Sequence, residues 1–377
     1  MRHSKKLRVA LLTPDFPPNP RGGCGVSSNL LVQELRKLGL CVDVYRVGKK
    51  EIAEKSSSGN IYHFVGFRKV PMINNLFAVI LLRGRLKKYD IIHVYNMSLI
   101  PAAVLLKGRD SKIFATINNT NGAVASTFVG KRKFKNKIND WLTTWMIKLF
   151  RGGVDCYIAL TAFLRRLYIE NGYVGHKIKM VPNMYDEIFV AKRNKESRKD
   201  GHVRILYVGQ LGDNKGVLDL AVVCKDLLND KKWKDKLKVK IIGDGKLRGV
   251  IETILKREIE SGSVEIFNEQ YEDLPDEYWN SDLLIHPAKW DEPFSRTWLE
   301  AMASELPILS SDNSSAKEVL AGYAIFFKMG DRESLKRAML EFLKNKTRED
   351  DGFFVERFNP KKVTNKIVKY YQIEHEI

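Results

Sequence analysis

A strand, a glycine-rich turn and a helix follow one another twice in this chain, and this repeat constrains the fold most. The first copy combines an apolar run at 7–12, Gly-Gly-Cys-Gly at 22–25 and a helical pattern over 27–38. The second copy starts with an apolar run at 203–208, followed by three glycines between 209 and 216. Each pattern is typical of the start of a doubly wound parallel sheet. Since 377 residues suffice for two domains, we expect an α/β protein with two of them.

The positive charge of the chain is concentrated in its first half. Residues 1–200 carry 36 Lys and Arg against 14 Asp and Glu, a balance of +22, whereas the rest of the chain has a balance of −3. Such asymmetry predicts an anionic partner for the first half, which from charge alone is a membrane, a nucleic acid or a phosphorylated substrate. The four cysteines are far apart, which is typical of a reduced, cytoplasmic protein without structural zinc. No apolar run is long enough to span a bilayer, and the basic start has no signal-peptide pattern.

Two carboxylates flank the start of a helix in the second half. The apolar run 282–285 predicts a buried strand, Glu292 follows it on a loop, and Glu300 lies within a helical stretch at 297–304. Open α/β sheets bind ligands at the carboxyl ends of their strands, and carboxylates there accept hydrogen bonds from sugar hydroxyls. The backbone N–H groups of 294–297 would add an anion site. Taken alone, the two carboxylates could equally be a loop glutamate and a helix-surface glutamate that are solvated and bind no ligand.

The surroundings of these carboxylates resemble a known family. Glu-Pro-Phe-Ser at 292–295 and Leu-Glu-Ala-Met-Ala at 299–303 resemble the Glu, seven residues, Glu motif of retaining glycosyltransferases of family four, the glycosyl transferases group 1. The glycine loop at 22–25, Pro-Asn at 182–183 and the stretch up to Lys215 resemble further motifs of that family, in the same order.

The resemblance implies the GT-B architecture, in which two Rossmann-like doubly wound domains face a central cleft. We place an acceptor-side domain at 1–190, a charged linker at 192–201 and a nucleotide-sugar domain at 201–358. The family also implies that the last residues, 359–377, form a helix that crosses back to the first domain.

The family's site residues fall on specific positions of this chain. Glu292 would bind hydroxyls of the donor sugar, Glu300 the ribose, and Lys215 the diphosphate, where negative charge builds up as the bond to the sugar breaks. We count Glu292, Lys215 and Asn118 as catalytic candidates. The remaining donor-binding candidates are Gly22, Gly23, Asn183, Gln210, Tyr271, Phe294, Ser295 and Arg296.

Four positions depart from the family pattern. Asn118 stands where the family has a histidine that contacts the donor sugar, and an amide cannot shuttle a proton. Gln210 replaces an arginine, and Ser295 and Glu305 replace glycines. These differences leave the donor sugar open.

The predicted reaction is sugar transfer with retention, by same-face attack of the acceptor hydroxyl. The donor would be a UDP- or GDP-linked sugar, and the acceptor a glycan or a lipid-linked sugar. Because the chain contains no Asp-x-Asp motif, we expect neither a metal nor another cofactor.

A basic segment with regularly spaced tryptophans predicts binding to an anionic membrane surface. Trp141 and Trp145 recur at helical spacing within 138–149. The predicted membrane-surface residues are Lys131, Arg132, Lys133, Lys135, Lys137, Trp141 and Trp145. The protein would then be cytoplasmic and peripheral on the inner face of the membrane. A helix packed on the sheet, with a solvated basic start, is the alternative.

Two other classes of function are compatible with parts of the sequence. The turn at 243–249 is one residue off the dinucleotide fingerprint, which would suit an NAD(P)-dependent oxidoreductase or a sugar epimerase. A non-enzymatic nucleic-acid binder would use the basic half, but the aromatic residues are not interleaved with the basic ones as in a stacking platform. We therefore expect no nucleic-acid partner.

Overall fold

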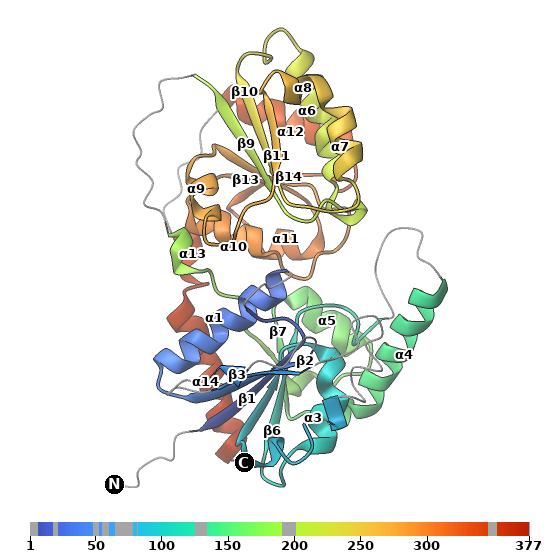
Figure 1. Ribbon diagram of the computed structural model, residues 1–377, viewed down its shortest axis with the longest axis vertical. Helices are drawn as coiled ribbons and strands as arrows, with labels where there is room; N and C mark the ends of the chain where they lie inside the picture. Colours follow the sequence, from blue (N-terminus) through green and yellow to red (C-terminus); the bar gives the residue numbers. More distant parts are fainter. Residues whose placement is uncertain are drawn as a thin grey trace. The chain divides into compact units, whose positions relative to one another are not determined.

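The computed structural model describes residues 7–17, 22–47, 53–54, 60–64, 78–80, 82–124, 134–190, 201–345 and 353–376. They fall into two compact units. Unit 1 takes the described residues up to Met184 and those from Phe358 on, and unit 2 takes Tyr185–Arg357 (Figure 1).

Unit 1 is built on a sheet with the strand order β3-β4-β2-β1-β5-β6-β7-β8. All of these strands pair in parallel except β3, which is antiparallel to β4. The strands are β1 (Arg8–Thr13), β2 (Cys41–Val47), β3 (Ala53–Glu54), β4 (Ile61–Phe64), β5 (Ile91–Val94), β6 (Lys112–Ile117), β7 (Cys156–Ala159) and β8 (Ile178–Met180). The helices are α1 (Gly23–Lys37), α3 (Ile100–Leu106), α4 (Phe134–Phe150), α5 (Ala162–Glu170) and α14 (Pro360–Glu376).

Unit 2 has a parallel sheet with the order β11-β10-β9-β12-β13-β14. Its strands are β9 (Val203–Val208), β10 (Leu237–Ile242), β11 (Val264–Phe267), β12 (Leu283–His286), β13 (Ile308–Ser311) and β14 (Ala324–Phe327). Its helices are α6 (Val217–Asn229), α7 (Arg248–Ile254), α8 (Lys256–Glu260), α9 (Leu274–Trp279), α10 (Arg296–Ala303), α11 (Ser314–Val319), α12 (Arg332–Asn345) and α13 (Phe353–Glu356). Numbered within the unit, this is the Rossmann order 3-2-1-4-5-6, which confirms the expected doubly wound α/β class.

The strand order explains where functional residues gather. In unit 2, β9 lies between β10 and β12, so the chain runs outward in both directions from the β9–β12 pair. In unit 1, the corresponding pair is β1 and β5. The loops at the carboxyl ends of such a pair diverge and leave a crevice, where doubly wound sheets bind ligands.

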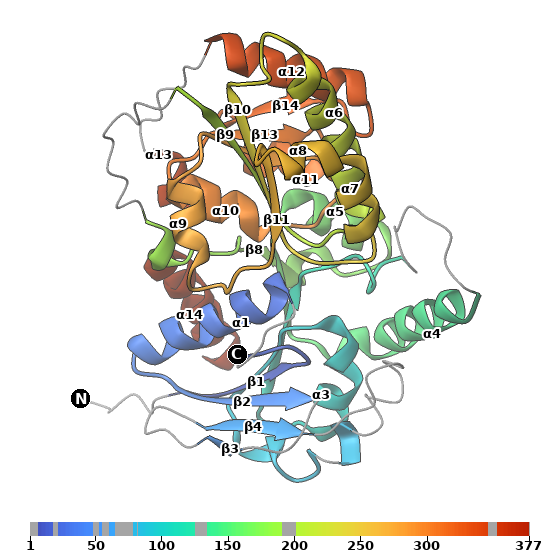
Figure 2. The ribbon, with the colours of Figure 1, turned by 45° about the horizontal axis from the view of Figure 1, so that its top comes forward.

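Both sheets are buried by helices on their two faces (Figure 2). The central strands β5, β7, β12 and β13 are buried along their whole length, as expected for parallel strands covered on both sides. In unit 1, α14 packs against α1, and its Val363, Ile367 and Tyr371 belong to the same apolar core as strands β1 and β5.

Two sequence-based boundaries need correction. The division between the units falls after Met184, not at 190, because Phe189 packs in unit 2. Its ring lies 5.3 Å from that of Tyr278, and its carbonyl accepts hydrogen bonds from Trp279 Nε1 and Ser304 Oγ. Helix α1 starts at Gly23 rather than at Ser27, so the glycines expected to form a loop make its first turn.

The expected linker at 192–201 lies outside the described residues except for Gly201. Among the helices that the structure describes, none combines the length and the apolar character needed to span a membrane.

Candidate functional site

Lys215 and Glu292, 77 positions apart in the sequence, form an ion pair in unit 2. Lys215 Nζ lies 2.6 Å from Glu292 Oε1. Lys215 ends the 3-10 turn Asp213–Lys215 that follows β9, and Glu292 lies on the loop that follows β12. The strand order therefore brings both residues to the crevice position of this sheet.

Glu292 is buried and ionised. His286, the last residue of β12, places Nε2 3.2 Å from Glu292 Oε2, but out of line, so that Oε2 makes no hydrogen bond among the described residues. Burial alone would raise the pKa of Glu292, yet the charge of Lys215 and the proximity of His286 outweigh it and hold this pKa well below its ordinary value. Sequence reasoning did not select His286, although its place at the strand end was a usable signal.

The backbone brings the two loops together. Gly216 has φ 68, in the left-handed region, and a Cβ there would lie 1.7 Å from the carbonyl oxygen of Pro287. The N–H of Lys289 donates to the carbonyl of Asn214 over 2.8 Å. Only glycine permits this approach, so Gly216 is required for the geometry of the Lys215–Glu292 pair.

Glu300 belongs to a second cluster in unit 2. The hydroxyl of Tyr278 donates to Glu300 Oε2 over 2.7 Å, and Arg296 Nε lies 3.5 Å from Oε1. Burial raises the pKa of Glu300 above its ordinary value, although Arg296 opposes this effect. Arg296 also donates to the hydroxyl of Tyr271, which in turn donates to Asp186. The sequence predicted Glu300, Arg296 and Tyr271 but not their partners Tyr278 and Asp186.

The other unit 2 candidates lie on the same two loops. Gln210 is exposed just beyond β9, and its carbonyl accepts a hydrogen bond from the hydroxyl of Tyr207. Ser295 is buried immediately before α10 and shares a 2.9 Å hydrogen bond with Thr297. The ring of Phe294 lies 6.2 Å from that of Trp298 in α10.

The candidates of unit 1 form a separate set around the start of α1. Gly22 precedes this helix and Gly23 begins it. Asn118, directly after β6, donates through Nδ2 to the carbonyl of Tyr95 over 2.7 Å and to Sγ of Cys24 over 3.2 Å. Its Oδ1 accepts from Asn119. Both N–H bonds of Asn118 are thus used within unit 1, which leaves a lone pair on Oδ1 as its means of contacting a ligand.

Tyr95 connects Asn118 with Asn183. Its hydroxyl donates to Asn183 Oδ1 over 3.2 Å, while its carbonyl accepts from Asn118. Burial raises the pKa of the neighbouring Cys24 thiol to about 12, so this cysteine stays protonated and is a poor nucleophile.

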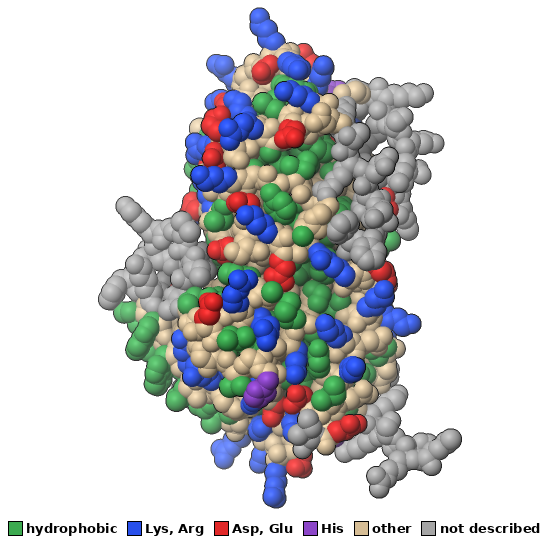
Figure 3. All heavy atoms as spheres, turned by 180° about the vertical axis from the view of Figure 1, so that it is seen from behind, with side chains coloured by type: hydrophobic (Ala, Val, Ile, Leu, Met, Phe, Trp, Pro, Cys, Tyr) green, Lys and Arg blue, Asp and Glu red, His purple; other side chains and the backbone are tan. Residues whose placement is uncertain are grey.

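Helix α4 exposes an apolar face. Ile138, Trp141, Trp145 and Leu149, spaced three or four residues apart, have exposed fractions of 44%, 58%, 53% and 63%. On the opposite side, Thr144 and Ile147 are buried. Figure 3 shows hydrophobic side chains gathered at the edge of unit 1 where α4 lies. Of the predicted basic residues, Lys131, Arg132 and Lys133 lie outside the described residues, and Lys135 and Lys137 lie in the first turn of α4.

Close packing explains two of the glycines in the turn at 243–249. A Cβ at Gly243 would lie 2.0 Å from the carbonyl oxygen of Gly209, and one at Gly245 would lie 2.4 Å from that of Leu211. These two glycines therefore let the turn after β10 pack against the loop after β9, and no dinucleotide is needed to explain them.

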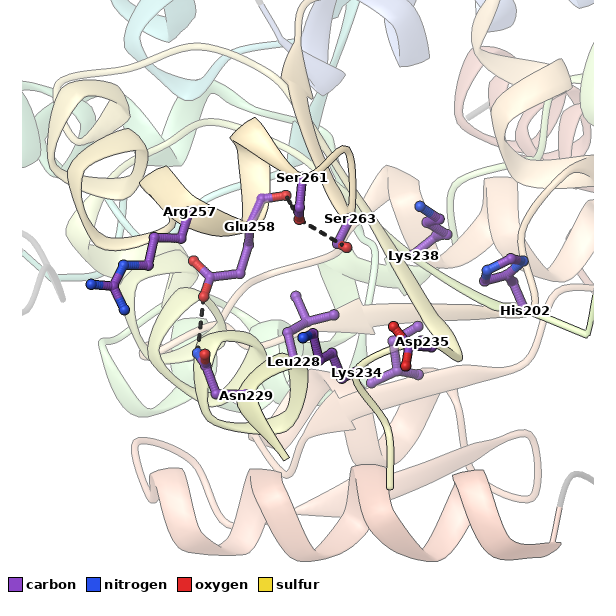
Figure 4. A pocket seen from close by; sticks show the side chains of 11 residues that line it. His202, Leu228, Asn229, Lys234, Asp235, Lys238, Arg257, Glu258, Ser261 and Ser263 are labelled. Atoms are coloured by element: carbon purple, nitrogen blue, oxygen red, sulfur yellow. Dashed lines mark hydrogen bonds between the residues drawn. The ribbon is translucent and has the colours of Figure 1, made fainter. Parts of the chain in front are cut away.

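A cavity of about 410 Å³ in unit 2 contains none of the predicted site residues (Figure 4). It is lined by His202, Lys238 and Ser263, which lie at the amino ends of their strands, and by Asn229 and Glu258. Asn229 donates to Glu258 Oε1, while Oε2 is shielded from solvent. The cavity lies at the end of the sheet opposite to the ligand-binding crevice. It is therefore a poor candidate for the reaction site.

Comparison with known proteins yields two family matches that meet near the division between the units. Residues 21–187 match the model of Glycosyltransferase Family 4, and residues 189–353 match that of Glycosyl transferases group 1.

The chain is also similar to individual proteins. It is 24% identical over 327 residues to an uncharacterised 41.2 kDa protein in the cps region of Klebsiella pneumoniae, covering 81% of this chain and 85% of the other. It is 30% identical over 122 residues to a GDP-mannose-dependent alpha-mannosyltransferase of Mycolicibacterium smegmatis, covering 32% and 29% of the two chains. Its fold is similar to that of sucrose-phosphate synthase from Thermosynechococcus elongatus, with a TM-score of 0.79, 16% identity and coverage of 97% and 98%.

Proposed function

Since the chain belongs to the glycosyl transferases group 1 and is therefore a glycosyltransferase, we propose that it transfers a sugar, with retention, from a UDP- or GDP-linked donor to a glycan or lipid-linked acceptor. The observation that carries this proposal is the ion pair between the half-buried Lys215 and the buried Glu292 at the crevice position of the unit 2 sheet. The mannosyltransferase relative, which is named for GDP-mannose, favours including GDP-sugars among the candidate donors.

In this proposal the two charged groups of the pair contact different parts of the donor. Glu292, kept ionised by Lys215, accepts hydrogen bonds from hydroxyls of the sugar. Lys215 stabilises the negative charge that grows on the departing diphosphate, assisted by the N–H groups at the start of α10. Glu300 would bind the ribose.

The reaction needs no nucleophile from the enzyme. The acceptor hydroxyl attacks the anomeric carbon from the face that the diphosphate leaves, the bond between sugar and phosphate breaks, and the acceptor proton passes to the leaving phosphate oxygen. Since no Asp-x-Asp motif occurs in the sequence, we expect the rate to be unchanged by EDTA.

The donor is identified by screening UDP- and GDP-sugars for thermal stabilisation and for release of nucleoside diphosphate. With the donor so found, Glu292→Ala and Lys215→Ala are each expected to abolish release while the protein stays folded. Lys240→Ala is the matched control, because Lys240 forms an equally short 2.6 Å ion pair with Glu277 in the same unit. Wild-type rates in both site variants would refute the proposed roles.

We also propose that the protein binds the cytoplasmic face of an anionic membrane through α4. The supporting observations are the exposed Trp141 and Trp145 on one helix face and the excess of 22 positive charges in residues 1–200. Tryptophan suits the interface between lipid headgroups and acyl chains, and basic residues are attracted to anionic lipids.

Sedimentation with vesicles tests this docking. The wild-type protein is expected to bind vesicles that contain both phosphatidylglycerol and phosphatidylcholine, but not vesicles of phosphatidylcholine alone. The double variant Trp141→Ser, Trp145→Ser is expected to lose this binding while its melting temperature stays unchanged. Replacing the exposed Ile80 by Ser (61% exposed) controls for a general loss of apolar surface. Equal partitioning of all proteins into both vesicles would argue against docking.

A further inference from the structure

Asp219, in the first turn of α6, ties three segments of unit 2 together. Its side chain is buried, with 4% of the residue exposed. Oδ2 is ion-paired with Nζ of Lys289 on the loop after β12, and Oδ1 accepts from Nε of Arg332 at the start of α12. A buried carboxylate is costly unless such partners compensate its charge. Asp219 therefore fixes the start of α6, the loop after β12 and the start of α12 relative to one another.

The two segments joined by the Asp219–Lys289 pair carry the proposed reacting groups. Lys215 lies four residues before Asp219, directly ahead of the same helix. Glu292 lies three residues after Lys289, on the same loop. Further along the same loop, Asp291 Oδ1 accepts a hydrogen bond from the N–H of Ser314. The Asp219–Lys289 contact is thus placed to set the separation of Lys215 and Glu292.

We propose that Asp219 is a positioning residue for sugar transfer, acting through Lys289 on the loop that carries Glu292. The inference rests on the proposed roles of Lys215 and Glu292. Asp219 lies outside the reacting pair, and what it contributes is their geometry. Misplacement of a reacting group by about 1 Å is enough to reduce turnover on the order of a hundredfold.

Variants of the two partners of Asp219 distinguish an effect on the position of the loop from an effect on the stability of the protein. Lys289→Met removes the tie to the loop and leaves Asp219 paired with Arg332. Arg332→Gln removes the tie to α12 and leaves the loop held. With the donor identified by the nucleotide-sugar screen, we expect kcat of Lys289→Met and of Asp219→Asn to fall about 10- to 100-fold at a nearly unchanged KM. Arg332→Gln is expected to lower the melting temperature and keep kcat within about twofold.

Asp226→Asn is the matched control for Asp219→Asn. Asp226 lies two turns further along α6 and pairs over 3.0 Å with Lys336 of α12, so it joins the same two helices without touching the loop. This variant is expected to keep the wild-type kcat.

A readout that needs no donor is the fluorine NMR signal of Trp290 in protein labelled with 5-fluorotryptophan. The ring of Trp290 lies 5.8 Å from Nζ of Lys215, so its resonance, assigned through Trp290→Phe, reports on the reacting pair. We expect it to shift or broaden in Asp219→Asn and Lys289→Met and to stay in place in Asp226→Asn.

The outcomes separate the inference from the proposed function. If Glu292→Ala and Lys215→Ala lose activity while Asp219→Asn and Lys289→Met keep the wild-type kcat and the Trp290 resonance, positioning by Asp219 is overturned and the proposed function stands. If Arg332→Gln lowers kcat as much as Lys289→Met, the effect is one of general stability, and the inference is equally overturned. Wild-type activity in Glu292→Ala and Lys215→Ala contradicts the proposed function itself.

Discussion

Backbone angles separate two residues that depart from the family pattern in the same way. Ser295 and Glu305 both replace glycines, but Ser295 has φ −94, which any residue adopts, whereas Glu305 has φ 53, in the left-handed region. A side chain there costs about 1–2 kcal/mol. The sequence alone showed both replacements and could not show which of them is strained.

Glu305→Gly is therefore expected to stabilise the protein by about 1 kcal/mol, because it relieves the left-handed strain. Ser295→Gly is the matched control and is expected to gain nothing, since its backbone is already relaxed. Urea denaturation of the two variants checks this. Equal effects of the two substitutions would show that φ 53 carries no cost here.

The ionisation of Glu292 gives a prediction about pH. Because its folded pKa lies below its ordinary value of 4.5, the charged carboxylate contributes stability that is complete above that value and is lost as the pH falls through the folded pKa. The loss of unfolding free energy in Glu292→Gln should thus be equal at pH 7 and pH 5.5 and smaller at about pH 3. If the loss of unfolding free energy in Glu292→Gln already halves between pH 7 and pH 5.5, this contradicts a lowered pKa of Glu292.

At the scale of elements, the sequence predicted the strands well because buried parallel strands are continuous apolar runs. The run at 203–208 coincides with β9, and the runs at 7–12 and 282–285 match β1 and β12 to within one residue. Helix α1 starts four residues earlier than predicted, because its first turn contains two glycines, which are poor helix formers and therefore favour a loop in the sequence pattern. His286 and Asp219 were missed because their importance arises from contacts with residues distant in the sequence, which no local pattern reveals.

The junction between the turn that ends at Lys215 and helix α6 gives a prediction at this scale. Gly216 and Gly262 have φ values of 68 and 67, but a Cβ at Gly216 meets the carbonyl of Pro287, while one at Gly262 meets nothing within 4 Å. Gly262→Ala should cost about 1 kcal/mol, and Gly216→Ala about 3 kcal/mol or more together with most of the activity. Denaturant unfolding and nucleoside diphosphate release measure the two effects. Similar losses at both positions would show that the Pro287 contact is unimportant.

At the scale of the whole molecule, α14 belongs to unit 1 although the chain of unit 2 precedes it. Tyr371 of α14 is fully buried, and its hydroxyl lies 2.5 Å from Nδ1 of His93 in β5, whose Nε2 contacts Thr116 in β6. Burial lowers the pKa of His93 to about 3, so this histidine is neutral and part of the core.

Unit 1 should therefore not fold from its first segment alone. A fragment of residues 1–184 is expected to lack a cooperative thermal transition, because Val363, Ile367 and Tyr371 are missing from its core. A peptide of residues 358–377 added in trans should restore the transition, and the same peptide with Tyr371→Ala should not. Residues 185–357 are expected to unfold cooperatively by themselves. A stable 1–184 fragment whose melting temperature the peptide leaves unchanged would contradict a structural role for α14.

The place of α14 in the chain also bears on biosynthesis. The ribosome delivers residues 360–376 after all of unit 2, so the domain that is begun first is completed last. Until α14 emerges, the apolar residues of unit 1 that it will cover lack this partner, so we expect chaperones to bind them while residues 185–357 already fold.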